Sequence, residues 1–217
     1  MPNASTSFFG WVAFLLQKYG MLFLRGTGMT LLIALTGTAL GFALGLLVAI
    51  IRTIALPEKK KAGSNAGVIV KRGLLRFVHM LMNVYIQVFR GTPMIVQAVV
   101  IYYGAQYAGV FMDTTFAAVF IISINTGAYM AEIIRGGIVS VDKGQFEAAH
   151  AIGMTHWQTM TTVVLPQAIR NILPSVGNEL IVNIKDSSVL NVISVSELFF
   201  QAKSAAGTYY RYFEVYF

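Results

Sequence analysis

Residues 26–51 have the sequence GTGMTLLIALTGTALGFALGLLVAII and contain no charged side chain. As an α-helix with a rise of about 1.5 Å per residue, this stretch would be about 39 Å long. The hydrocarbon core of a bilayer is only ~30 Å thick. The stretch therefore predicts a transmembrane helix and indicates a membrane protein.

The composition of the whole chain agrees with this prediction. Of its 217 residues, 56% are hydrophobic and 12% are charged, whereas soluble domains carry about 25% charged residues. This composition excludes a disordered chain and disfavours an ordinary soluble enzyme. The chain has no cysteine, which excludes a disulfide, a thiol nucleophile and a cysteine-ligated metal.

Further apolar stretches follow the first one. The second, residues 77–103, is interrupted by Arg90, Gly91 and Pro93. Aromatic residues are frequent in residues 209–217, which is typical of the interfacial start of a span. We predict an all-α polytopic membrane protein with the start of a fifth transmembrane helix after four complete ones, at residues 26–51, 77–103, 114–131 and 174–198.

The first 25 residues are expected to form a separate segment. Residues 1–9 lack the positive charge and the cleavage pattern of a signal peptide. Trp11, Phe14, Leu15 and Lys18 favour a short interfacial helix that anchors the chain before the first span. Residues 1–25 are thus predicted to be an extracytoplasmic interfacial segment, and residues 26–217 the transmembrane domain.

The basic residues set the expected orientation. Seven Lys or Arg lie between Arg52 and Arg76, and none lies from residue 91 to residue 130. Because loops rich in Lys and Arg stay in the cytoplasm, this loop is predicted inside and the N-terminus outside. Ten basic residues then lie inside, four outside, and two, Arg90 and Lys185, within spans. The net charge of +7 is therefore an orientation signal, and we expect no nucleic-acid binding.

Two smaller patterns concern packing and the first loop. Gly37, Gly41 and Gly45 recur every four residues, so they share one helix face and predict the close approach of another helix. Lys59–Lys61 are explained by the same orientation signal, in preference to contact with anionic lipid. Residues 62–67 are rich in Ala, Gly, Ser and Asn, which favours a flexible loop.

Residues 140–166 predict two short cytoplasmic helices joined by a turn. Asp142 and Gln145 have the spacing of an N-cap residue and its partner at N3. Gly153 is suited to end this first helix in the left-handed conformation. The small residues Ala148, Ala149 and Ala151 would allow the helix to enter a groove on another protein.

The second helix of this segment has a similar start. Thr155 and Gln158 repeat the capping pattern. The helix is expected to end before Leu165 and Pro166, because residues that precede proline avoid the helical region. The spacing alone is also compatible with a hairpin that lies on the membrane surface without a partner, although it favours the docking helix.

The sequence of this hairpin, EAAHAIGMTHWQTMTTVVLP, resembles the EAA loop of the permeases of ABC importers. FRGTPMIVQ at residues 89–97, AEIIRGGI at 131–138 and NELIVNIKDSSVL at 178–190 are similar to the polar amino acid permeases of that superfamily. The resemblance extends from Gly26 to the last residue. The positions that define the EAA pattern are Glu147, Ala148, Ala149, Gly153, Leu165 and Pro166.

The resemblance implies a type I ABC importer permease fold for residues 26–217, in the inner cell membrane. It implies that the EAA helix docks on a cytoplasmic ATPase, and it implies two ATPase copies, a second permease subunit that is identical or related, and an external solute-binding protein. No G-x-x-x-x-G-K-[ST] phosphate loop is present here, so ATP and magnesium are expected in the partner ATPase. The chain itself is predicted to be no enzyme and to hold no cofactor or metal. Chains of this family usually continue through another span.

Ionisable and polar residues within predicted spans are the candidates for contact with a polar amino acid. Arg90 is suited to hold a carboxylate through paired hydrogen bonds. Structural alternatives stay open: Arg90 pairs with Glu132 or another acid, and Lys185 extends to the membrane surface or binds backbone carbonyls. The substrate-path candidates are Arg90, Thr92, Asn125, Glu132, Lys185, Asp186 and Ser187.

A different class of function is also compatible with these patterns. An ion channel, or a membrane scaffold, would need similar spans and could use the hairpin to bind a cytoplasmic partner. The EAA pattern and the lack of a filter-like repeat favour the permease over both.

Overall fold

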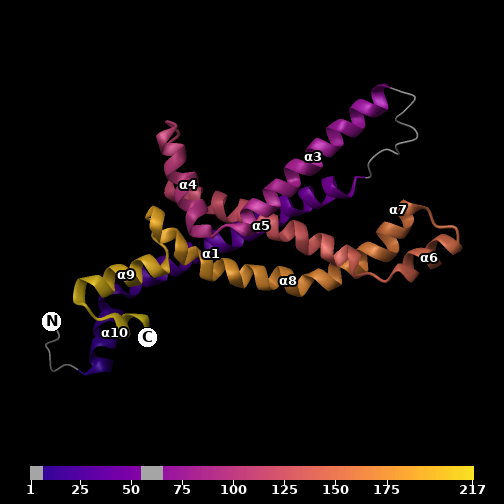
Figure 1. Ribbon diagram of the computed structural model, residues 1–217. Coiled ribbons are helices and arrows are strands. Elements are labelled where there is room, and N and C mark those ends of the chain that lie inside the picture. The colour runs from indigo at the N-terminus through magenta and orange to yellow at the C-terminus, as the bar shows by residue number, and fades with distance from the viewer. Residues whose placement is uncertain (1–6, 55–65) are drawn as a thin grey trace. The chain divides into compact units, whose positions relative to one another are not determined.

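A computed structural model describes residues 7–54 and 66–217, and every regular element in these two ranges is helical (Figure 1). Lys59–Lys61 and most of the predicted loop at residues 62–67 lie outside the described residues. The all-α prediction is confirmed. The elements are α1 (Phe8–Thr53), α3 (Ala66–Gly91), α4 (Met94–Tyr107), α5 (Thr114–Val139), α6 (Lys143–Ala151), α7 (His156–Gln158), a π-helical segment (Thr159–Val164), α8 (Leu165–Asp186), a 3₁₀ segment (Ser187–Ile193), α9 (Leu198–Tyr209) and α10 (Tyr212–Tyr216).

Of the four complete membrane spans that the sequence predicts, the long helices of the described residues match at most three. Helix α1, with 46 residues, and α5, with 26, are long and apolar enough to cross a membrane. A third span results if α3 and α4 count as one broken helix. The break at residues 92–93 confirms the interruption predicted from Gly91 and Pro93.

The fourth predicted span differs from the structure. Helix α8 begins at Leu165, contains Pro174 and ends at Asp186, where a 3₁₀ segment replaces the expected continuation to residue 198. The hydroxyls of Ser187 and Ser188 donate hydrogen bonds to carbonyls three residues earlier, at 2.8 and 2.7 Å. These bonds favour the tighter 3₁₀ turn and end the regular α-helix.

The expected interfacial helix is also not a separate element. Helix α1 runs without interruption from Phe8 to Thr53. Between Lys18 and Gly26 the chain has no proline and no Ser, Thr, Asp or Asn, and Gly20 lies within the continuous helix, so the helical hydrogen bonds are not interrupted there.

The chain divides into two compact units. The first unit comprises the described residues up to Gly37, Met94–Ile122 and Val182–Phe217. The second unit comprises the described residues of Thr38–Pro93 together with Ser123–Ile181.

The core of the first unit joins residues that are far apart in the sequence. Ile33 of α1, Ala98 of α4, Ile121 of α5 and Leu190 of the 3₁₀ segment are fully buried in one cluster. The N-terminal part of α1 also contacts α9, because Lys18 Nζ donates a 2.6 Å hydrogen bond to the hydroxyl of Tyr209. These contacts give the first unit its own apolar interior.

The core of the second unit depends on close contact between α1 and α5. A Cβ atom added at Gly45 would lie 2.4 Å from Met130 Cβ, and one added at Gly41 would lie 2.6 Å from Thr126 Cβ. Such distances leave no room for a side chain. The predicted close approach is confirmed for these two glycines.

Candidate functional site

The EAA hairpin is built by short helices with strong local stop and start signals. Asp142 caps α6 and accepts a 2.7 Å hydrogen bond from the N–H of Gly144. Gln145, expected to complete this cap, instead accepts a 3.4 Å hydrogen bond from Gln167 of α8. The first helix is confirmed, and Gln145 ties it to α8.

The turn between the two helices depends on Gly153. Its φ angle is +81°, in the left-handed region that favours glycine. The N–H of Gly153 donates to the carbonyl of His150 and that of Met154 to the carbonyl of Ala149, both at 3.0 Å. This pair of bonds is a Schellman motif, and it confirms the predicted role of Gly153.

The second helix begins with the predicted capping box. The N–H of Gln158 donates to Thr155 Oγ1 at 3.3 Å, and Gln158 Oε1 accepts from the N–H of Thr155 at 2.9 Å. Reciprocal bonds of this type satisfy two backbone donors at a helix start. Both ends of the turn at Gly153 are therefore fixed.

The predicted stop at Leu165–Pro166 is wrong. Helical structure continues through a π-helical segment, Thr159–Val164, into α8, which begins at Leu165. The N–H of Leu165 donates to the carbonyl of Met160, five residues earlier. Pro166 thus lies at the second position of α8, within continuous helical structure.

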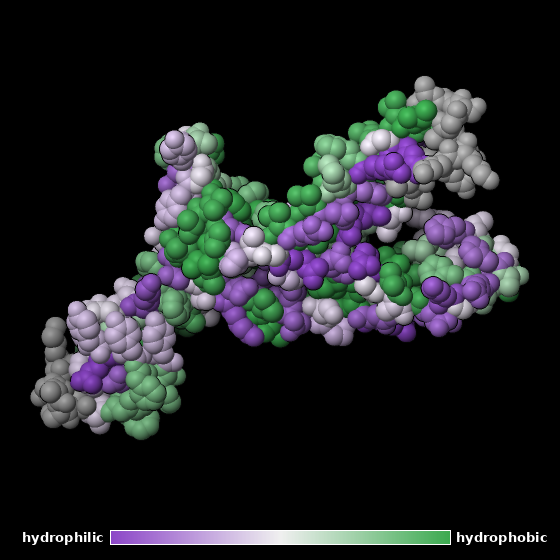
Figure 2. Space-filling model, in the orientation of Figure 1, coloured by the Kyte–Doolittle hydropathy of each residue, from purple (hydrophilic) through white to green (hydrophobic). Residues whose placement is uncertain are grey.

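The hairpin exposes some of the EAA residues and buries one. Glu147 and Ala148 are exposed, whereas Ala149 is 3% exposed and packs inside. Ile152 and Trp157 are 79% and 75% exposed, one on each side of Gly153. Large exposed apolar side chains are typical of protein interfaces, and the sequence reasoning missed these two. Figure 2 shows polar and apolar side chains mixed over α6 and α7.

A second group of candidates meets at the end of α3, in the second unit. Asn125 Nδ2 donates to the carbonyl of Phe89 at 3.3 Å, and Thr92 Oγ1 donates to the carbonyl of Val88 at 2.8 Å. The guanidinium of Arg90 lies 5.3 Å from the ring centre of Tyr129. Tyr129 was not predicted, because only the packing of α3 against α5 brings it to Arg90.

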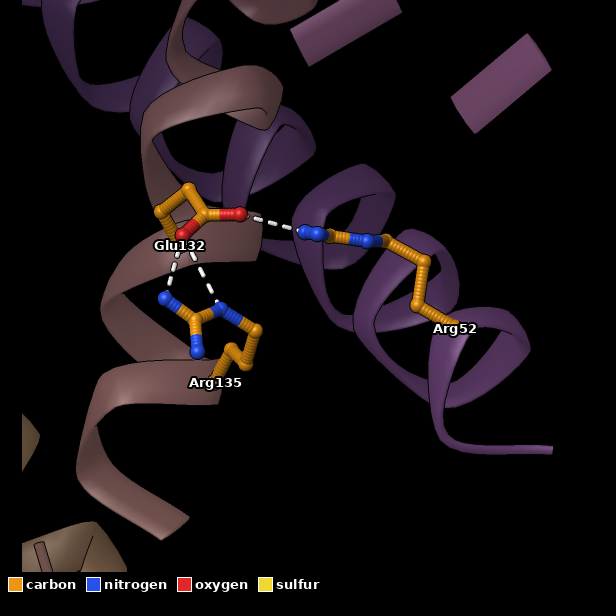
Figure 3. A network of polar contacts seen from close by, with 3 residues as sticks. All are labelled: Arg52, Glu132 and Arg135. Atoms are coloured by element: carbon orange, nitrogen blue, oxygen red, sulfur yellow. Dashed lines mark hydrogen bonds and ion pairs between the residues drawn. The ribbon is translucent and has the colours of Figure 1, made fainter. Parts of the chain in front are cut away.

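The carboxylate of Glu132 is bound by two arginines, Arg52 and Arg135 (Figure 3). Its Oε2 accepts hydrogen bonds from Nε and Nη2 of Arg135 at 3.0 and 2.9 Å, and its Oε1 accepts one from Arg52. The alternative pairing of Glu132 with Arg90 is therefore not found. Arg135 could have been anticipated, since it follows Glu132 by three residues on one helix.

The remaining candidates lie in the first unit, at the end of α8. Lys185 and Ser187 line a cavity of about 440 Å³, and Glu197, which is 1% exposed, also lines it. Asp186 is the last residue of α8. The predicted path residues are thus divided between the two units.

Comparison with known proteins assigns the chain to a family. A family model described as "Binding-protein-dependent transport system inner membrane component" matches residues 63–212. The glutamine transport system permease protein GlnP of Escherichia coli (strain K12) is 38% identical over 196 residues, which cover 89% of this chain and 81% of the relative.

Solved structures agree with this assignment. A crystal structure of "an amino acid ABC transporter with histidines" has a TM-score of 0.81 at 37% identity and covers 100% of this chain and 88% of its own. The methionine ABC transporter MetNI in an inward-facing conformation has a TM-score of 0.64 at 22% identity, covering 90% of this chain and 82% of its own, which shows the shared fold. The chain therefore belongs to the binding-protein-dependent inner membrane components, the multi-pass permease subunits of ABC importers.

Proposed function

We propose that the chain forms the translocation pathway of an importer for polar amino acids and couples it to a separate ATPase through the EAA hairpin. The observation that supports this most strongly is the rigid hairpin of residues 142–164. Its caps and its Schellman motif hold Glu147, Ala148 and Trp157 exposed. A rigid element transmits a displacement that a flexible loop would absorb.

The substrate class is supported by the relatives. The Escherichia coli relative is named for glutamine, and the solved relative is an amino acid transporter described with histidines. Both amino acids have polar side chains. The path candidates of this chain, Arg90, Thr92, Asn125, Lys185, Asp186 and Ser187, supply the charged and polar groups that a zwitterionic amino acid needs.

The proposed assembly follows from the family. Two ATP-binding subunits, which hold ATP and magnesium, bind the hairpins of this permease and of a second permease subunit, identical or related. An extracytoplasmic solute-binding protein delivers the amino acid. In this arrangement the N-terminus lies outside, and the hairpin lies in the cytoplasm.

The test is ATP-driven uptake into vesicles that contain the permease and its ATPase, with the solute-binding protein outside. We expect uptake of at least one polar amino acid, such as glutamine or histidine, only when ATP is present. Glu147→Lys and Gly153→Ala are each expected to lower uptake at least several-fold while ATP hydrolysis continues. The first reverses a charge on the docking surface, and the second strains a left-handed residue by about 1 kcal/mol.

Gly207→Ala is the matched control, because a Cβ atom at Gly207 would meet nothing within 4 Å. Its uptake should equal that of the unmodified chain. Flux without ATP would favour the channel alternative. Unchanged coupling in both hairpin variants would contradict the proposed role of the hairpin.

A further inference from the structure

Arg90 is a cation near the end of a membrane helix without an acidic partner in the described residues. Arg52, Arg135 and Arg211 form ion pairs with glutamates in the described residues, whereas Arg90 contacts the ring of Tyr129. The side chain of Arg90 is exposed. A charged side chain that faces lipid hydrocarbon is costly, so its exposure favours a polar surrounding that supplies an anion.

The position of Arg90 along α3 places it deep within the apolar stretch. It follows Phe77, where this stretch begins, by thirteen residues, which corresponds to about 20 Å of helix. The hydrocarbon core is ~30 Å thick. If α3 enters from the cytoplasmic side, Arg90 lies well inside the core and not at the near membrane surface.

Two side chains of α5 hold the last turn of α3 in place. Asn125 and Tyr129 are four residues apart, so they lie on one face of α5. Asn125 donates to the carbonyl of Phe89 at 3.3 Å, which fixes the backbone next to Arg90. Tyr129 presents its ring 5.3 Å from the guanidinium, which restricts the side chain.

This geometry suits recognition of a carboxylate. The guanidinium carbon of Arg90 lies over the ring of Tyr129 at a cation–π distance, and this contact uses none of the N–H donors of the guanidinium. Two parallel N–H donors match the two oxygens of a carboxylate, and such paired bonds are stronger than bonds between neutral groups. The ring thus restrains the guanidinium and leaves its N–H donors for paired binding.

We propose that Tyr129 is a positioning residue, which orients Arg90 to bind the α-carboxylate of the transported amino acid. The inference rests on the proposed function, since it needs an amino acid substrate. Beyond the proposed function, the inference adds Tyr129 to the pathway and names the α-carboxylate as the substrate group that Arg90 binds.

The test measures equilibrium binding to the purified, nucleotide-free permease–ATPase complex, without the solute-binding protein. The probes are the amino acid with the highest uptake in the vesicle assay, glutamine or histidine for example, and its α-amide as competitor. The complex should prefer the acid to the amide. Tyr129→Leu should weaken the acid about 2- to 30-fold, and Arg90→Gln about 10- to 100-fold, with the amide nearly unchanged in both.

Two controls separate positioning from folding. Tyr129→Phe keeps the ring and should restore the preference for the acid. Arg76→Gln removes another exposed arginine from α3 and should leave both affinities unchanged. Thermal unfolding of each complex shows whether a variant is folded.

Three results would overturn the inference. In the first, Tyr129→Leu weakens acid and amide equally, which means that the ring only shapes the cavity. In the second, the unmodified complex does not distinguish acid from amide. In the third, Arg90→Gln lowers the amount of bound phospholipid while the affinity for the acid is unchanged, which identifies the anion as a lipid phosphate. Each can occur in a transporter with normal amino acid uptake, so failure here is distinct from failure of the proposed function.

Discussion

At the residue scale, the contacts of Glu132 indicate a structural role in place of the substrate contact that its position in the sequence suggests. The sequence places it among the candidates for substrate contact. In the structure, however, both of its oxygens are occupied by arginines, one from α1 and one from its own helix. A carboxylate held in this way links Arg52 at the end of α1 to α5. We therefore assign Glu132 to stability and not to the substrate.

Replacing Glu132 with Gln should lower the free energy of unfolding by about 1–3 kcal/mol. The reason is that Arg52 and Arg135 would lose their shared counter-charge in a site where Glu132 is 19% exposed. Thermal unfolding of the purified permease–ATPase complex measures the effect. Arg76→Gln, at an exposed arginine of α3, is the control and should leave the midpoint unchanged. Equal midpoints for both variants would show that the arginine pairs contribute nothing.

The partners of Glu132 and Arg90 show why contacts between residues far apart in the sequence are not predicted from the sequence. Arg135 lies one helical turn from Glu132, and this spacing is visible in the sequence. Arg52, in contrast, is 80 residues away, and Tyr129 reaches Arg90 only through the packing of α3 on α5. Contacts of this second kind depend on tertiary structure, which residue spacing does not encode.

At the element scale, local signals predict both ends of α6 and the start of α7, whereas the helix ends expected at Leu165–Pro166 and at residue 198 are wrong. Asp142, Gly153 and the capping box at Thr155 act through backbone bonds within a few residues, so the sequence is sufficient to predict them. Leu165–Pro166 failed as a stop because the chain widens into a π-turn instead of ending. The end of α8 at Asp186 was also missed, because two serine hydroxyls decide it.

The contact between α1 and α5 predicts opposite effects for two glycines of one helix. Gly45→Ala should lower the free energy of unfolding by about 1–3 kcal/mol, since overpacking forces neighbouring atoms apart. Its Cβ would also lie 2.8 Å from the backbone nitrogen of Ala131, which cannot rotate away. Gly28→Ala, in open space, should instead stabilise α1 by about 0.5–1 kcal/mol. Thermal unfolding of the two variants side by side is the measurement, and a milder effect at Gly45 than at Gly28 would contradict the packing.

For the whole molecule, the charge distribution carries information that the helices alone do not. Among the described residues, two helices are long and apolar enough to cross a membrane, or three with the broken pair, and length and composition give no direction across it. The basic residues supply that direction, since seven of them lie between Arg52 and Arg76. The proposed orientation therefore rests on electrostatics and needs its own test.

The absence of cysteine from the sequence makes the orientation directly measurable. Ser7→Cys and His156→Cys each introduce one reactive thiol at an exposed position. In right-side-out vesicles, a membrane-impermeant maleimide should label Ser7→Cys at once and His156→Cys only after the vesicles are opened. The reverse pattern would place the N-terminus inside and exclude the proposed coupling to a cytoplasmic ATPase.

The π-helical segment before α8 has a consequence for the direction in which the hairpin points. A π-turn accommodates one more residue than a regular α-helical turn, and each residue of an α-helix advances by about 100° around the axis. The extra residue therefore determines the direction, around the helix axis, in which the side chains before it point, including that of Trp157. Deleting one residue from Thr159–Val164 would keep both caps intact and rotate the exposed side chains by more than a quarter of a turn. The π-helical segment thus determines the direction in which the hairpin points, whereas the caps determine its rigidity.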